Sequence, residues 1–175
     1  MNVIPKLPCI VLFLSIATCL YSCSSPTASK AAHVTPNPMQ DEVKPLSKKD
    51  ETWLQQAEQH ILQVLQAHYG NCEFTYTERD LVLVQRLIDD GFIKSDQLLE
   101  QQCLGVVLGN VFTHQTRMRW SVVTNDFGTL IAIYDAKIKF TLYPITMISQ
   151  RMDDRRKIDM PALYKSFVAD LSLTN

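Results

Sequence analysis

The sequence predicts a single α+β domain, in which N-terminal helices precede a three-stranded antiparallel meander and one or two C-terminal helices follow it. The main observation is a change of period. Apolar residues recur every three to four positions as far as residue 112, and every second position between residues 120 and 142. The composition of the 175 residues, 46% hydrophobic and 20% charged, is typical of a globular protein. A net charge of −1 gives no general attraction to nucleic acid, which we exclude as a partner.

The first two predicted helices have clear start and stop signals. Ser47 is suited to capping the first helix, and Gly70 follows its last apolar residue. The second helix opens at residues 77–80 with Thr-Glu-Arg-Asp and ends at Gly91. Both helices therefore have defined lengths before any tertiary contact is considered.

A third helix is predicted from Ser95, its expected cap, with the leucines at 98–99 turned inward. Gly105 and Gly109 lie one turn apart inside it. They are not part of a phosphate-binding loop, because the Lys-Ser/Thr pair of that loop is missing. We expect this glycine face to pack closely on Trp120 or on another helix.

The meander is predicted from three alternating segments. The strands at residues 120–124 and 129–134 flank a four-residue turn at 125–128, whose glycine suits a positive φ. The third strand, at 137–142, alternates lysine or threonine with apolar residues and ends at Pro144. Two more helices are expected, at residues 145–151 and from Asp159 onward.

Several short segments in this region resemble one known family. They are Leu-Gly-Val-Val-Leu-Gly at 104–109, Trp120 before a strand, Asp-Phe-Gly at 126–128, and Pro-Ile-Thr-Met-Ile-Ser-Gln-Arg at 144–151. In this order and spacing they resemble the bacterial family called domain of unknown function 3806, over residues 79–168. The resemblance supports the fold and brings no activity, cofactor or catalytic residue.

The N-terminal residues resemble the leader of a bacterial lipoprotein. After Lys6, the mainly apolar run 7–20 has 14 residues. It would extend about 21 Å as a helix, less than the roughly 30 Å of a bilayer's hydrocarbon core. Leu-Tyr-Ser-Cys at 20–23 then resembles the lipobox, in which the signal is removed just before a cysteine that receives lipid. The resemblance implies a signal peptide at residues 1–22 and lipidation, including palmitate, at Cys23.

Residues 23–46 are predicted to be the lipidated cysteine and a disordered tether. Four of the chain's eight prolines fall in 24–46, with almost no large apolar residue to offset the entropy of ordering. The folded domain is then expected at 47–175. Ser24 after the cysteine resembles lipoproteins sent to the outer membrane of Gram-negative cells. We therefore expect a lipid-anchored protein in the bacterial cell envelope, facing the periplasm from the outer membrane.

Two cysteines remain in the predicted folded domain, Cys72 and Cys103. In an exported protein they can form a disulfide. They can also be two unpaired thiols, since Cys103 falls inside a predicted helix. The sequence leaves both alternatives open.

No motif in the sequence predicts a catalytic site, a metal site or a cofactor. It has no Gly-x-Ser-x-Gly, no His-Glu-x-x-His and no Cys-x-x-Cys. We therefore expect a non-enzymatic envelope module, an accessory or immunity-type protein, that binds a protein or envelope component. The alternative is a hydrolase of an envelope polymer, its site assembled from scattered residues such as His114, Asp126 and Arg151.

Overall fold

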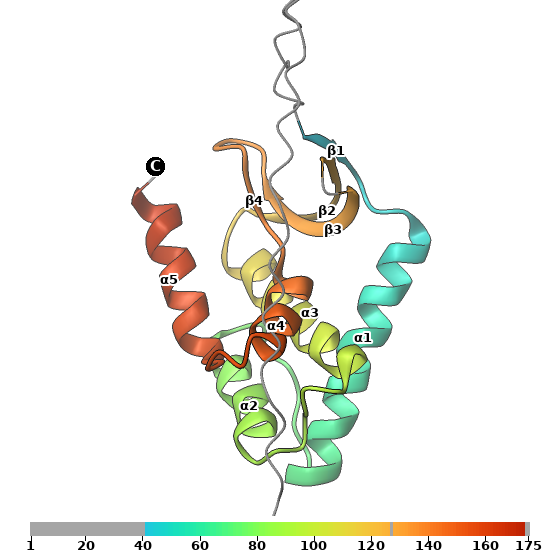
Figure 1. Ribbon diagram of the computed structural model, residues 1–175, viewed down its shortest axis with the longest axis vertical. Helices are drawn as coiled ribbons and strands as arrows, with labels where there is room; N and C mark the ends of the chain where they lie inside the picture. Colours follow the sequence, from blue (N-terminus) through green and yellow to red (C-terminus); the bar gives the residue numbers. More distant parts are fainter. Residues whose placement is uncertain (1–40, 127, 174–175) are drawn as a thin grey trace, which may run out of the picture. The chain divides into compact units, whose positions relative to one another are not determined.

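The computed structural model describes residues 41–126 and 128–173 (Figure 1). The predicted signal peptide, Cys23 and most of the predicted tether lie outside these residues. In chain order the elements are β1 (Glu42–Lys44), α1 (Lys48–Tyr69), α2 (Glu78–Asp89), α3 (Leu98–Gln115), β2 (Arg119–Asn125), β3 (Gly128–Asp135), β4 (Phe140–Leu142), α4 (Pro144–Asp153) and α5 (Met160–Leu173). The α+β class, with helices on both sides of an antiparallel meander in the sequence, is confirmed.

The sheet has four strands in the order β1-β2-β3-β4, all antiparallel, rather than the three predicted. The additional strand, β1, lies in the range expected for the tether. Val43 of β1 is paired with Val123 of β2, and Leu46 packs against the core. The three residues of β1 precede Pro45 and are too few to show an alternation of polar and apolar residues. The segment is therefore a strand because it pairs with β2, not because of local propensity.

The ends of α1 and α2 follow the predicted signals. The Ser47 hydroxyl accepts a hydrogen bond from the Asp50 N–H at 3.3 Å, and the Asp50 carboxylate accepts from the Ser47 N–H at 3.0 Å. Gly70 ends α1 with φ +82°, and Gly91 follows α2 with φ +73°. These conformations favour glycine, so both helices stop where the sequence predicts.

Helix α3 is the centre of the domain and is buried around most of its circumference. Every residue from Cys103 to Gly109 is buried, and α3 contacts α1, α2, α4, α5 and β2. A helix that is apolar on all sides needs such surroundings. Its predicted beginning was wrong, since the N-cap is Gln97 rather than Ser95, and Leu98 and Leu99 are each 54% exposed.

The two glycines of α3 allow two elements to approach it closely. A Cβ at Gly105 would lie 2.5 Å from the Ile145 Cα at the start of α4. A Cβ at Gly109 would overlap the Trp120 ring of β2. The prediction that the glycine face packs closely on Trp120 or on another helix is confirmed. Gly109 packs on Trp120, and Gly105 packs on α4.

Strands β2 and β3 form a hairpin that is longer than predicted. Asn125 pairs with Gly128, so only residues 126–127 lie between the strands rather than four turn residues. β4 is shorter than predicted, because Lys139 has φ +53° and interrupts the extended backbone before Phe140.

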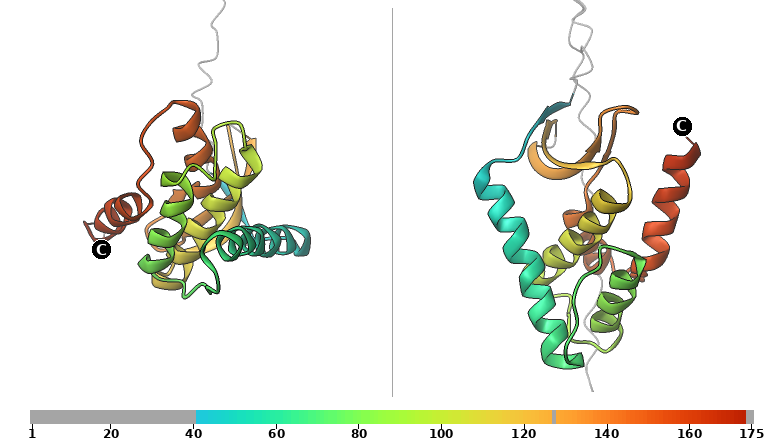
Figure 2. Two further views of the ribbon diagram at one scale, coloured as in Figure 1. Left: turned by 90° about the horizontal axis from the view of Figure 1, so that it is seen from below. Right: turned by 180° about the vertical axis from the view of Figure 1, so that it is seen from behind.

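Figure 1 shows α2, α3 and α4 below the sheet, whereas the upper end of α5 reaches the level of the sheet. Figure 2 shows α1 and α5 on opposite sides of α3. Among the described helices, none combines the length and hydropathy needed to span a bilayer.

Candidate functional site

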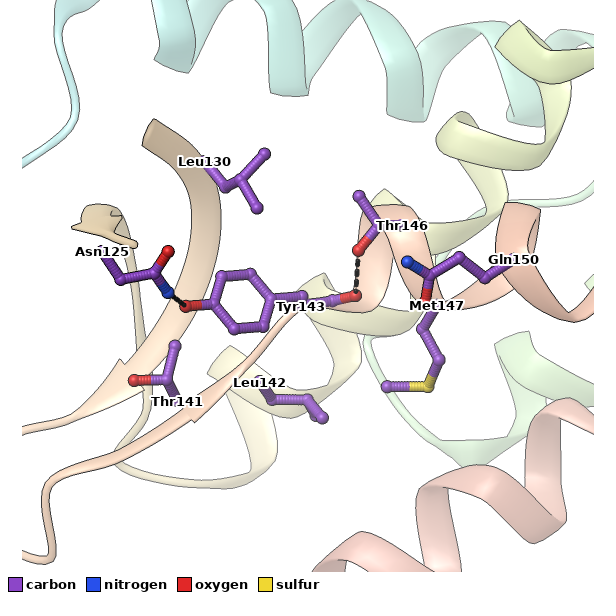
Figure 3. A pocket seen from close by; sticks show the side chains of 8 residues that line it. All are labelled: Asn125, Leu130, Thr141, Leu142, Tyr143, Thr146, Met147 and Gln150. Carbon is purple, nitrogen blue, oxygen red and sulfur yellow. Dashed lines mark hydrogen bonds between the residues drawn. The ribbon is translucent and has the colours of Figure 1, made fainter. Parts of the chain in front are cut away.

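A cavity of about 410 Å³ lies where the sheet meets α4 (Figure 3). It is formed by the last residue of β2, the beginning of β3, the last two residues of β4 with the following Tyr143, and the first two turns of α4. No residue of the lining carries a formal charge. The lining consists of Asn125, Leu130, Thr141, Leu142, Tyr143, Thr146, Met147 and Gln150.

Tyr143 joins β4 to α4 and fixes the polar part of the cavity. The Asn125 side-chain amide donates to the Tyr143 hydroxyl at 3.1 Å, and the Thr146 hydroxyl donates to the Tyr143 carbonyl at 3.3 Å (Figure 3). Burial raises the pKa of Tyr143, the nearby charge of Asp41 raises it further, and the hydrogen bond from Asn125 opposes the rise. The phenol therefore stays protonated at neutral pH, and a hydroxyl of this kind can donate a hydrogen bond as well as accept one.

Leu130, Leu142 and Met147 form the apolar part of the lining. Leu130 is one of the few large apolar side chains with substantial exposure, at 36%. Leu142 is buried in the core, and Met147 packs against the core from α4. An apolar group in the cavity would cover Leu130 and contact Met147. A methionine side chain is flexible and adapts to groups of different shape.

The cavity also reaches the edge of the sheet. β4 is an edge strand, paired only with β3 in the described sheet. Thr141 and Leu142 are neighbours in β4, and neighbouring residues of a strand point to opposite faces. Both residues line the cavity, so the cavity borders the edge strand. Its occupant would therefore lie beside an edge that can pair with another strand.

The two cysteines predicted as a possible disulfide are free in the structure. Cys103 is 1% exposed inside α3, where burial, followed by the charge of Glu100, raises its pKa to about 11. Cys72 is partly buried in the α1–α2 connection. The two thiols are not bonded to each other in the structure, and neither lines the cavity at β4.

The three residues named for a hydrolase are not brought together in the cavity at β4. Asp126 and Arg151 each follow a lining residue, Asn125 and Gln150, without being part of the lining. His114 lines a different cavity beside α1. Sequence reasoning missed Asn125, Leu130 and Tyr143 as site residues, and the one local signal was a tyrosine directly before the proline that opens α4.

Metal ligation has little support in the described part of the chain. Within residues 41–126 and 128–173, no three histidine, cysteine, aspartate or glutamate side chains gather as a metal site would require. His68 stacks on Phe92 with ring centroids 3.7 Å apart, and His60 Nε2 lies 3.9 Å from a Glu100 oxygen.

The chain is similar to one protein family and to one solved structure. The family model "Domain of unknown function (DUF3806)" matches residues 80–164, just under half of the chain. A crystal structure from Bacteroides thetaiotaomicron VPI-5482 superposes with a TM-score of 0.66 at 16% identity, over 73% of this chain and 47% of that one. The chain thus spans about half of that protein, and the likeness establishes the fold. No curated protein matches. The part of the chain that matches the DUF3806 family model starts in α2 and ends in α5.

Proposed function

We propose that the protein is a lipid-anchored, non-enzymatic binding module of the bacterial cell envelope, and that the cavity at β4 takes an extended polypeptide segment of a partner protein. The observation that carries the proposal is that a neutral, largely apolar cavity borders β4, which pairs only with β3 among the described residues. An extended segment satisfies both features at once, because it pairs its backbone with the edge and places alternate side chains in pockets.

The lining defines which side chain fits. With Leu130, Leu142 and Met147 on its walls and no formal charge, the cavity favours an apolar side chain. The hydroxyl of Tyr143 and the amide of Gln150 supply hydrogen bonds for the backbone on either side of it. A charged side chain would lose its hydration there without gaining an ion pair with the lining.

The anchoring half of the proposal rests on the sequence. Leu-Tyr-Ser-Cys at 20–23 resembles a lipobox, and Ser24 resembles the residue that follows the cysteine in outer-membrane lipoproteins. Multiple acyl chains on Cys23 would hold the protein at the membrane, whereas one chain binds only weakly. We propose that the domain faces the periplasm from the outer membrane.

The binding site is tested in cells by placing a photo-crosslinking amino acid at Met147 of the full-length protein. We expect a defined protein adduct that disappears when Leu130→Lys places a charge at the cavity. Val82→Lys is the matched control, because Val82 is also an exposed apolar residue, at 52%, and lies on α2 outside the cavity. An adduct that persists in the Leu130→Lys variant, or one lost equally in both variants, would contradict the site.

The anchor is tested by labelling cells with a palmitate analogue and separating their membranes. Label should enter the wild-type protein, which should fractionate with the outer membrane, and Cys23→Ala should abolish the label. Persistence of the label in that variant would refute lipidation at Cys23. It would not affect the proposed binding site at β4, which the cross-linking experiment tests separately.

A further inference from the structure

A second cavity, of about 240 Å³, lies between α1, α3 and β2. It shares no lining residue with the cavity at β4. Its walls combine carboxylates, aromatic rings and apolar side chains. The lining consists of Leu46, Glu51, Leu54, Gln55, Glu58, Tyr76, Asn110, Thr113, His114 and Trp120.

A chain of hydrogen bonds fixes one wall of this cavity. The indole Nε1–H of Trp120 donates to Asn110 Oδ1 at 2.8 Å, and Asn110 Nδ2 donates to Glu58 Oε2 at 3.1 Å. Burial raises the pKa of Tyr76, and a hydrogen bond to Glu58 and the charge of that carboxylate add to the rise. Tyr76 is therefore a protonated phenol at neutral pH, and Glu58 receives hydrogen bonds from two neutral groups.

The aromatic wall is also held in place. The rings of Tyr76 and His114 stack with centroids 3.9 Å apart and an interplanar angle of 7°. His114 Nδ1 lies 2.8 Å from the Asn110 carbonyl oxygen, which can accept only from a protonated nitrogen. Gln115 Nε2 donates to the Tyr76 carbonyl at 2.7 Å. These bonds fix both rings before any ligand arrives.

The charge of the cavity is unbalanced. Glu51 and Glu58 both line it, and the lining contains no lysine or arginine. Within the described residues, neither glutamate forms an ion pair. Glu58 is partly buried, so its charge is less screened by water than that of a surface carboxylate. A ligand with a positive charge would supply the missing counter-ion.

We propose that this cavity binds a protonated primary alkylamine, such as the side chain of a lysine on a partner protein. An ammonium group donates hydrogen bonds to the Glu58 carboxylate and is attracted by the faces of aromatic rings such as Trp120. The methylene stem of the ligand packs on Leu46 and Leu54. A primary amine fits better than a quaternary one, because only the primary amine has N–H groups for the carboxylate oxygens.

Trp120 provides a direct readout of binding. The chain has two tryptophans, and Trp53 is not part of this lining. In the full-length Trp53→Phe variant, all tryptophan fluorescence therefore comes from Trp120. We expect Nα-acetyl-lysine methylamide to change this fluorescence saturably, and the same compound acetylated on Nε, which has no positive charge, to leave it unchanged.

Substitution of the carboxylate separates binding from packing. Glu58→Gln keeps the size of the side chain and one acceptor for Asn110, and we expect it to weaken binding about tenfold or more. Glu73→Gln is the control, because Glu73 is exposed and outside the lining. If Glu58→Gln does not fold, as judged by thermal unfolding, Glu51→Gln is expected to weaken binding in the same direction.

Three results would overturn the proposal. These are the absence of a saturable response to the lysine compound, an equal response to its Nε-acetylated form, and unchanged affinity in the folded glutamate variants. None of them bears on the cavity at β4, whose test uses other residues.

Discussion

Gly109 of α3 lies directly against the indole ring of Trp120 on β2, so that a methyl group at position 109 would overlap ring atoms Cζ2 and Cη2. The same indole donates its Nε1–H to Asn110, the next residue of α3. The glycine thus sets the distance between helix and strand, and the hydrogen bond sets the orientation of the ring. Together they shape the cavity that also contains Glu58.

Replacing this glycine should be costly. We expect Gly109→Ala to lower the free energy of unfolding by about 1–3 kcal/mol, because the ring or the helix must move to accommodate the methyl group. Urea denaturation measures the change. In the Trp53→Phe background the fluorescence of Trp120 should shift as well.

The two shortest contacts of the added Cβ are with the six-membered ring of the indole, and a third, of 3.1 Å, is with the Pro144 Cγ. The indole contacts provide a second test. Trp120→Phe removes that bulk, so Gly109→Ala should cost less in a Trp120→Phe background than in the wild-type chain. A double-mutant cycle measures this coupling. Additive effects of the two substitutions would show that the contact does not determine the cost.

Asp135 should stabilise the fold at neutral pH. The side chain is nearly buried, which by itself would raise its pKa. Hydrogen bonds from Arg117 and from the backbone N–H groups of Lys137 and Ile138 outweigh burial and lower the pKa. Because the folded-state pKa lies below the unfolded value of about 3.9, the contribution is complete above that value and is lost as the pH falls through the folded pKa.

We therefore expect Asp135→Asn to destabilise the protein by about 1–3 kcal/mol at pH 7, and by less as the pH falls below about 4. Urea denaturation at several pH values measures the difference. Asp96→Asn, at an exposed position, should have little effect at any pH. A difference for Asp135→Asn that does not change with pH would contradict this account.

Cys103 should be unreactive until the protein unfolds. Its thiol is 1% exposed, and its raised pKa of about 11 leaves little of the reactive thiolate at neutral pH. Iodoacetamide should label the partly exposed Cys72 in the native protein, and Cys103 only in denaturant. Peptide mapping by mass spectrometry measures both. Recovery of a linked peptide from unreduced protein would instead establish the disulfide between them.

Residues 41–46 should contribute to stability, although the sequence predicts them to be tether. A chain that begins at Ser47 loses β1 and the contact of Leu46 with the core. We expect it to be less stable than a chain that begins at Asp41 by about 1–2 kcal/mol, which is part of the value of a fully buried leucine. Equal unfolding free energies would show that β1 adds nothing to the fold.

The parts of the fold that were predictable depend on local signals. Ser47 with Asp50, and Gly70, act within one helical turn, so the ends of α1 follow from the sequence. β1 was not predictable, because its three residues become a strand only through pairing with residues about 80 positions later. The hairpin turn was predicted too long for a similar reason, since Asn125 and Gly128 are weak strand formers that pair with each other.

The candidate sites were less predictable than the fold. Glu58, Asn110 and Trp120 belong to three elements, and only the packing of α3 between α1 and β2 brings them together. Tyr143 and Asn125 meet across 18 positions of the chain. His114 lines the cavity beside α1, and Asp126 and Arg151 are not part of that lining. Such groupings depend on tertiary geometry, which has no periodic signature.

The place of β1 has a mechanical consequence. The strand is joined to the sheet by three residue pairs with β2, whereas the β2–β3 hairpin has seven. Tension along the chain before Asp41 reaches the domain through those three pairs, so β1 should detach while the hairpin and the helices remain folded. Detachment of residues 41–46 would lengthen the connection by about 20 Å. It would also withdraw the charge of Asp41 from Tyr143, so the pKa of that phenol would fall toward its ordinary value.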